Sequence, residues 1–267
     1  MLKTLADFPS TKLGDSVIYN ADCIEIMKLM ESKSVDAVIT DPPYGHNNNN
    51  GDLISRWEAA LGIGSYVPEI QNRPIANDGF EANQLFKDCL PEYKRLLVVG
   101  GCCCCCCGGG GPDPQYARWS LWMDEILDFK QMIVWDKGPM GMGWHYRRSY
   151  ETILVASNGS PVKWYDKTKK IENIIRPHTL GIRKILPQKD DHPTLKPVNL
   201  FVHFIKLHTL PGDTILDPFM GSGTTGVACV QTGRNFIGVE IDPGYYKIAE
   251  RRIHDAQLQM ILPMEIT

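Results

Sequence analysis

Asp41-Pro42-Pro43-Tyr44 closes a run of small and β-branched apolar residues, 35–40, which predicts a buried strand ending in a rigid polar loop. A strand signal at 17–20 and a helical apolar stripe from Ile24 to Met30 precede it. These pieces predict a β-α-β unit with the acidic loop at the carboxyl end of its second strand. Ligands bind at that end of the strands in open α/β sheets, so the sequence predicts a site around Asp41.

The rest of the chain alternates between strand and helix signals. Alternation of this kind predicts an α/β protein with a mostly parallel sheet and helices on both faces. The polar stretch from Gly45 to about Asn77 is too long for a simple connection, which predicts a functional or mobile segment. Further strands are expected at 95–100, 132–135, 151–156, 214–216 and 235–239, and helices at 80–93, 116–130, 199–208, 224–232 and 245–259.

A second motif, Asp217-Pro218-Phe219-Met220-Gly221-Ser222-Gly223-Thr224-Thr225, leaves a strand and opens a helix. Its glycines remove side chains from the turn, and Glu240 ends the next strand 240 − 217 = 23 residues later. This spacing fits a turn that accommodates a nucleoside and an acid that binds its ribose hydroxyls. A glycine turn that only permits close packing has the same appearance.

Together, and in this order, the two motifs resemble the β group of DNA amino-methyltransferases, which modify exocyclic amines of DNA bases. The resemblance covers roughly residues 15–45, 85–100, 130–156 and 190–255. It implies the S-adenosylmethionine-dependent methyltransferase fold, circularly permuted so that the catalytic half precedes the cofactor half. It also implies a single domain, 1–267, with a catalytic half at about 15–155, a target-recognition insertion at about 156–191 and a cofactor half at about 192–260.

The same resemblance implies an S-adenosylmethionine site. His192-Pro193-Thr194-Leu195-Lys196-Pro197 is similar to the family segment that wraps the methionine end of the cofactor. Asp22 stands where the family places an acid near the adenine, although it could equally be an exposed helix N-cap. Residues 135–137 and Glu151 also recur in the family, and we interpret them as structural. The implied cofactor residues are Asp22, Thr194, Lys196, Asp217, Phe219, Gly221, Gly223, Thr224 and Glu240.

The resemblance also assigns the catalytic residues Asp41, Pro42, Pro43 and Tyr44. An adenine N6 amine is a poor nucleophile because its lone pair is delocalised into the ring. The Asp41 side chain and the rigidly placed Pro42 carbonyl would accept its hydrogens, and Tyr44 would stack on a base extruded from the duplex. An Asp at the first position favours adenine N6 over cytosine N4. Enzymes acting on RNA or protein amides usually open the motif with Asn and place the cofactor loop first.

Residues 156–191 carry the local basic signal, with eight Lys and Arg against four Asp and Glu, so 8 − 4 = +4, and interleaved aromatic residues. Lysines beside aromatic residues suit contact with phosphates and bases, and a solvated charged loop is the alternative. We expect double-stranded DNA as the partner and Lys163, Lys167, Lys169 and Lys170 as its contacts. The sequence leaves open a cognate restriction endonuclease and a homodimer as further partners.

Composition sets outer limits on function. The 267 residues are 43% hydrophobic and 22% charged, which is ordinary for a globular protein. The net charge of −3 excludes a uniformly basic surface, so a nucleic-acid site must be a local patch. No apolar run approaches the roughly 20 residues of a membrane helix, and residues 1–7 lack a signal-peptide core. We expect a cytoplasmic protein with no membrane partner.

Six of the nine cysteines are consecutive, Cys102 to Cys107, between Gly100-Gly101 and four further glycines. Metal sites need separated ligands, and adjacent cysteines cannot all converge on one ion. The run therefore predicts neither a metal site nor a disulfide framework, and we interpret it as an abnormal low-complexity loop beside the active site. The run Asn47 to Asn50 invites the same interpretation. Two irregular loops at the pocket leave open a DNA-binding relative that has lost catalysis.

Overall fold

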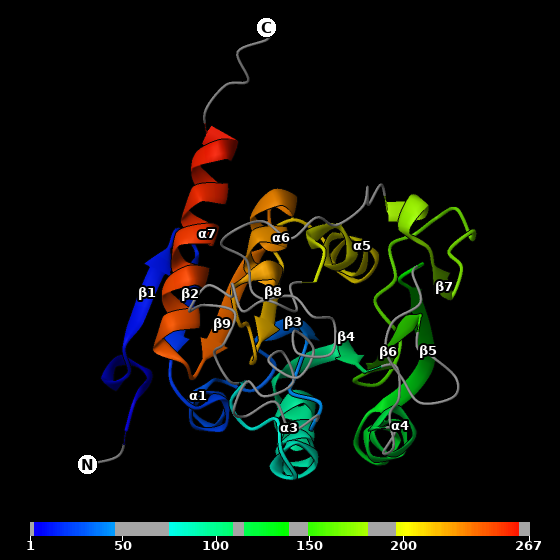
Figure 1. Ribbon diagram of the computed structural model, residues 1–267, viewed down its shortest axis with the longest axis horizontal. Helices are drawn as coiled ribbons and strands as arrows, with labels where there is room; N and C mark the ends of the chain where they lie inside the picture. The colour runs from blue at the N-terminus through cyan, green and yellow to red at the C-terminus, as the bar shows by residue number, and fades with distance from the viewer. Residues whose placement is uncertain (1–2, 46–74, 109–114, 139–148, 181–195, 262–267) are drawn as a thin grey trace, which may run out of the picture.

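One nine-stranded sheet, in the order β1-β2-β9-β8-β3-β4-β6-β5-β7, forms the centre of the protein (Figure 1). The computed structural model describes residues 3–45, 75–108, 115–138, 149–180 and 196–261. The pairs β2–β9, β9–β8, β8–β3, β3–β4 and β5–β7 are parallel, and the other three are antiparallel. This confirms the predicted mostly parallel sheet. The strands are β1 (Ser10–Leu13), β2 (Ser16–Asn20), β3 (Val35–Thr40), β4 (Leu97–Cys107), β5 (Asp128–Asp136), β6 (Tyr150–Ser157), β7 (Ile174–Ile175), β8 (Thr214–Asp217) and β9 (Asn235–Glu240).

Helices cover both faces of this sheet, as predicted (Figure 1). α5, α6 and α7 pack on one face and share one hydrophobic core with it. α1, α3 and α4 pack on the other face around a second core. The helices are α1 (Cys23–Leu29), α3 (Glu81–Leu96), α4 (Gln115–Ile126), α5 (Val198–His208), α6 (Thr224–Thr232) and α7 (Pro243–Ile261), with 3-10 turns η1 (Leu5–Asp7) and η3 (Pro177–Leu180).

The interpretation of the cysteine run as a loop is wrong. Cys102 to Cys107 form most of β4, pairing in parallel with β3 and antiparallel with β6. All six side chains are buried, alternating between the two cores. A central strand buried on both faces needs a continuous apolar run, and cysteine behaves there as a small hydrophobic residue. The run therefore builds the core and gives no reason to doubt the pocket.

The glycines before this run explain why the strand signal at 95–100 is displaced. α3 continues to Leu96, and the pairing of β4 with β3 shifts between Leu97 and Cys102. Gly100 has φ 78°, and a Cβ atom there would lie 2.0 Å from the Pro161 carbonyl oxygen. Only glycine permits this irregularity, which sets the register of the cysteines that follow.

Two short strands, β1 and β7, escaped the sequence analysis because edge strands carry a weak apolar signal. The run Asn47 to Asn50, and the segment 46–74 around it, lie outside the described residues. Among the residues described, no helix is long and apolar enough to cross a membrane. The circular permutation and the domain boundaries stay predictions.

Candidate active site

The catalytic loop lies where the sequence predicts it, at the carboxyl end of β3. The Tyr44 hydroxyl donates a hydrogen bond to Asp41 Oδ1. Lys196 Nζ donates to Asp41 Oδ2 at 2.6 Å and also lies 3.1 Å from the Tyr44 hydroxyl oxygen. Two segments 155 residues apart therefore meet at a single carboxylate.

A second acid, Glu151 at the start of β6, extends this charged cluster. Glu151 Oε2 lies 3.3 Å from Lys196 Nζ, and Oε1 lies 2.6 Å from Lys137 Nζ. We interpreted Glu151 and residues 135–137 as structural, whereas Glu151 and Lys137 belong to the same ionic network as Asp41. The available signal was a lone acid at the edge of an otherwise apolar strand.

The network keeps Lys196 and Glu151 charged. Burial by itself would lower the pKa of Lys196, whose side chain is only 7% exposed, but Asp41 and Glu151 outweigh burial and raise that pKa above its ordinary value. Burial would raise the pKa of Glu151, but Lys196 and Lys137 outweigh it, so that pKa is lowered. Burial, followed by the charge of Asp41, raises the pKa of Tyr44 well above its usual range. The phenol is therefore neutral and donates its proton to Asp41.

Asp78, which the sequence analysis missed, holds the backbone of the loop that carries Tyr44. Its Oδ1 accepts hydrogen bonds from the backbone N–H groups of Tyr44 at 2.9 Å and Gly45 at 2.8 Å. Gly45 has φ 72°, which suits glycine, and Asp78 is buried. A buried carboxylate holding two backbone donors makes the position of Tyr44 well determined.

The glycine turn after β8 lies directly beside the catalytic strand. Thr40 is the last residue of β3, and its Oγ1 donates a hydrogen bond to Asp217 Oδ1 at 2.7 Å. Thr225 Oγ1 donates a hydrogen bond to Asp217 Oδ2 at 2.5 Å. Asp217 is only 2% exposed, and burial raises its pKa to about 6. Its side chain therefore joins the two motifs from inside the protein. This argues for a positioning role and against the direct cofactor contact that we predicted.

Glu240, at the end of β9, holds the other side of the turn. Its Oε2 accepts from Gly221 N at 2.9 Å and its Oε1 from Asp242 N at 2.8 Å. Burial raises the pKa of Glu240 to about 7. A carboxylate oxygen has two lone pairs, so both oxygens retain capacity to accept a ligand hydroxyl.

The two glycines of the turn differ in what surrounds them. Both have positive φ, 50° at Gly221 and 82° at Gly223. A Cβ atom at Gly223 would lie 2.9 Å from Ala249 of α7, whereas a Cβ atom at Gly221 would meet nothing within 4 Å. Gly223 is therefore required by helix packing, and Gly221 borders open space. Contact of a nucleoside with Gly221 and the Glu240 carboxylate stays a prediction.

Comparison with known proteins agrees with this geometry. The profile of the DNA methylase family matches residues 35–251, which include both motifs. The chain belongs to the DNA methylase family. The DNA adenine methyltransferase YhdJ of Escherichia coli (strain K12) is 27% identical over 275 residues, covering 91% of this chain and 85% of YhdJ.

Solved structures agree as well. The crystal structure of the M1.HpyAVI-SAM complex has a TM-score of 0.56 and 28% identity, covering 88% of this chain and 98% of that one. The cytosine-N4-specific PvuII DNA methyltransferase shares the fold, with a TM-score of 0.62 and 18% identity over 94% of this chain and 88% of the other. S-adenosylmethionine is the methyl donor of this DNA methylase, as predicted.

The remaining predicted cofactor residues occupy different settings in this methylase. Asp22 is the N-cap of α1 and accepts from Ile24 N and Glu25 N. The preceding residue donates from its backbone to the Glu240 carbonyl at 3.1 Å, so Asp22 and Glu240 lie at adjacent strand ends. Phe219 packs against the second core, and Thr224 is buried beside Arg252. Thr194 lies outside the described residues.

The predicted DNA-contacting lysines of the methylase separate into two groups. Lys163 Nζ is paired with Asp36 Oδ1 at 2.7 Å. Asp36 lies near the amino end of β3, opposite the end that carries Asp41, which argues against the predicted DNA contact for Lys163. Lys167, Lys169 and Lys170 are exposed on a turn that Asp166 stabilises through Lys169 N at 2.9 Å, and their DNA contact stays a prediction.

Proposed function

We propose that this methylase transfers a methyl group to the N6 amine of adenine in double-stranded DNA. The observation that carries the proposal is the Asp41 carboxylate, held by Tyr44 and Lys196 beside the glycine turn. A carboxylate is a strong acceptor for the two hydrogens of an exocyclic amine. YhdJ, an adenine methyltransferase by name, supports adenine as the base.

The ionic network suggests how Asp41 becomes available to the substrate. Both of its oxygens already accept from protein donors, and an incoming amine can replace the Lys196 ammonium at Asp41 Oδ2. Lys196 Nζ already lies 3.3 Å from Glu151 Oε2. If the amine replaces Lys196 at Asp41 Oδ2, Glu151 still neutralises the charge of Lys196. The exchange thus leaves no buried charge unpaired, which would otherwise cost several kcal/mol.

The chain supplies placement and electrostatics for the transfer. S-adenosylmethionine supplies an electrophilic methyl group on a sulfonium leaving group. Asp41 accepts an amine hydrogen and thereby localises the nitrogen lone pair, and the rigid Pro42 carbonyl is placed for the second hydrogen. Tyr44 is fixed by Asp78 and would stack on the extruded base.

Methylation of cytosine N4 is the second candidate, because its amine poses the same chemical problem. The PvuII enzyme shares the fold at 18% identity, which carries no argument about the base. The alternative of a DNA-binding relative without catalysis rested in part on the interpretation of the cysteine run as an irregular loop. That run is an ordered strand, so it no longer supports this alternative. The test is to incubate the protein with duplex DNA and S-adenosylmethionine and to identify the methylated nucleoside by mass spectrometry. We expect N6-methyldeoxyadenosine; N4-methyldeoxycytidine would overturn the proposal for adenine, and no methylated nucleoside would overturn catalysis.

A further inference from the structure

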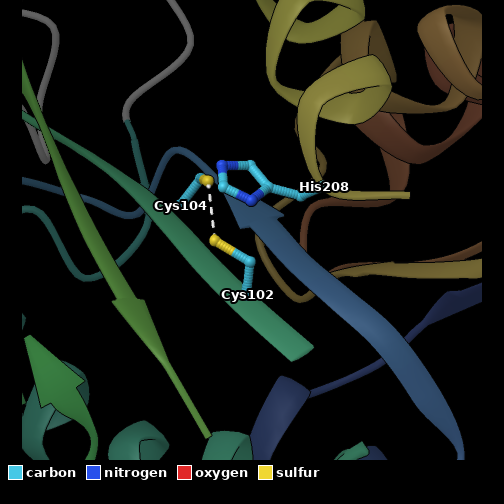
Figure 2. Close-up of side chains that lie close together, drawn as sticks. All are labelled: Cys102, Cys104 and His208. Carbon is cyan, nitrogen blue, oxygen red and sulfur yellow. Dashed lines mark hydrogen bonds between the residues drawn. The ribbon is translucent and has the colours of Figure 1, made fainter. Parts of the chain in front are cut away.

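Three potential metal ligands that are not part of the Asp41 network meet in the core. Cys102 and Cys104 lie on the same face of β4, and His208, the last residue of α5, points at them (Figure 2). Their residues are 0%, 1% and 3% exposed. The two Sγ atoms are 3.4 Å apart, and the ligand atoms of all three residues lie within 4.8 Å of one another.

The sequence argument against a metal site assumed that consecutive cysteines cannot converge. In a strand, alternate side chains share a face, so residues i and i+2 of the run point the same way. His208 approaches them from a helix 104 residues further along. Two thiols and an imidazole therefore converge through tertiary structure, without any local spacing motif.

The imidazole is already oriented as a ligand. His208 Nδ1 lies 3.1 Å from the backbone carbonyl oxygen of Lys163. A carbonyl oxygen only accepts, so Nδ1 carries the proton and Nε2 keeps its lone pair on the side of Cys104 (Figure 2). Metal-binding histidines commonly donate their other N–H to a backbone carbonyl in this way. The Trp164 ring, 5.3 Å away between centroids and edge-to-face, fixes the imidazole plane further.

The spacing fits a tetrahedral ion. Two sulfur ligands at about 2.3 Å from a tetrahedral zinc ion are about 3.8 Å apart, close to the observed separation of the two thiols. The imidazole nitrogen lies at most 4.8 Å from the sulfur atoms, so reaching ligand spacing needs an approach of at most about 1 Å. Such a shift is within the reach of side-chain rotation.

Charge balance favours a divalent ion. Zinc binding would break the two S–H bonds of Cys102 and Cys104 and release both protons to solvent. Two thiolates and a neutral imidazole then bring the net charge with Zn²⁺ to zero, which a buried site tolerates. A monovalent ion in the same set would leave one negative charge in the core.

Access and a fourth ligand come from a neighbouring cavity. His208 and His203 line a cavity of about 140 Å³ beside β5, β7 and α5, which has room for a water molecule. The charge of Asp41 acts on the thiols of Cys105, Cys106 and Cys107, whereas Cys102 and Cys104 precede them along β4. An ion here would join β4 to the end of α5 without touching the methyl-transfer site.

We propose that Cys102, Cys104 and His208 bind one Zn²⁺ ion, with water from the cavity side as the fourth ligand, as a structural link between β4 and α5.

Cobalt titration of the full chain tests the site. The protein is stripped with a chelator under reducing conditions and titrated with Co²⁺, and then Zn²⁺ is added as competitor. We expect one equivalent of Co²⁺, a thiolate-to-cobalt charge-transfer absorption, and its loss on addition of Zn²⁺. Absence of that absorption in the wild-type protein would overturn the proposal.

Matched variants locate the ligands. Cys102→Ala, Cys104→Ala and His208→Ala should each lose or reduce the absorption, and Zn²⁺ should raise the Tm of the wild type but not of these variants. Cys103→Ala is the control, because its thiol lies on the opposite face of the same strand. An unchanged absorption in the double variant Cys102→Ala/Cys104→Ala would assign the metal elsewhere and refute the site.

X-ray absorption of the zinc-loaded wild type keeps the test independent of how the variants fold. We expect two sulfur neighbours at about 2.3 Å and nitrogen or oxygen at about 2.0–2.1 Å. Four sulfur neighbours, or none, would refute the assigned ligand set.

Discussion

At the scale of single residues, the ionic network around Asp41 determines what the site can do. Asp41 and Glu151 share Lys196 between them, and Lys137 neutralises the far side of Glu151. One carboxylate can therefore be released to a substrate while the lysine keeps a partner. The motif supplied Asp41 and Tyr44, but only the pairing of β4 with β3 on one side and with β6 on the other brought Glu151 into the site.

Asp41→Ala should lower single-turnover methylation by about 10²–10⁴-fold, because a positioned polar partner of the amine is lost. S-adenosylmethionine affinity should stay nearly unchanged in calorimetry. Asp36→Ala is the matched control, since Asp36 is also an acid of β3 paired with a lysine, at 2.7 Å, but at the opposite end. A fully active Asp41→Ala protein would contradict the mechanism.

Glu151→Gln tests the exchange of Lys196 between the two acids. The amide cannot take over the charge of Lys196, so the ammonium should stay on Asp41 and compete with the substrate amine. We expect single-turnover methylation to fall by about tenfold or more, an effect of at least about 1.4 kcal/mol, with DNA and cofactor binding retained. Glu172→Gln, which removes an exposed partner of Arg176, is the control. Equal rates in both variants would exclude the exchange.

At the scale of elements, the turn between β8 and α6 separates two uses of glycine. We expected Gly223 to make room for the nucleoside, but its missing side chain makes room for α7. Gly221 is the position that borders open space. The two positions share a positive φ and differ in their neighbours, so a pair of alanine variants distinguishes ligand space from packing.

Gly221→Ala should cost about 1–2 kcal/mol of unfolding free energy for its left-handed backbone and should weaken S-adenosylmethionine binding by about 10–100-fold. Gly223→Ala should cost a further 1–3 kcal/mol or so through its contact with Ala249. Its cofactor affinity should be close to that of the wild type under folding conditions. Urea unfolding measures the change in unfolding free energy of both variants, and calorimetry measures their affinity for S-adenosylmethionine. Wild-type affinity in Gly221→Ala would contradict a nucleoside site beside Gly221.

The turn that carries Lys167, Lys169 and Lys170 is the exposed basic element in the described part of residues 156–191. Replacing all three with glutamine should weaken DNA binding and reduce the slope of log K against log salt by up to about 3, since fewer counterions are released. Lys163→Gln is the control, because Lys163 is paired with Asp36. A wild-type slope in the triple variant would place recognition in another segment, such as residues 45–77.

At the scale of the whole molecule, one sheet brings the acids of the two motifs together at the carboxyl ends of neighbouring strands. β9, β8 and β3 are adjacent; β9 and β8 end at Glu240 and Asp217, and Asp41 directly follows the end of β3. Burial at this shared edge raises the pKa of Asp217 to about 6 and of Glu240 to about 7. The raised pKa values of Asp217 and Glu240 therefore couple the stability of the fold to pH.

The unliganded protein should gain stability from Glu240 as the pH falls from about 8 to about 6. The folded-state pKa is above the unfolded value of 4.5, so the folded state takes up the proton first, and the contribution is lost as the pH rises through about 7. Glu240→Gln should show a smaller rise in Tm over this range. The pKa of His203 is lowered and that of His208 is raised, in both cases in the wild type and the variant alike, so the comparison of the two proteins isolates Glu240. Superimposable profiles would contradict the prediction.

The sequence by itself determined the fold class, most of the strands and helices, and the two motifs, because apolar periodicity and turn residues are local properties. It also determined the family, since both motifs are contiguous stretches. Tertiary structure decided which residues meet: Glu151 joins Lys196, Asp78 fixes Tyr44, and Lys163 is withdrawn to Asp36. Tertiary structure also decided that the six consecutive cysteines form a central strand. A run of cysteines has no clear local preference, and here neighbouring strands and helices bury it on both faces. Contacts between residues that are distant in the sequence depend on how the sheet is assembled, and local patterns do not encode that.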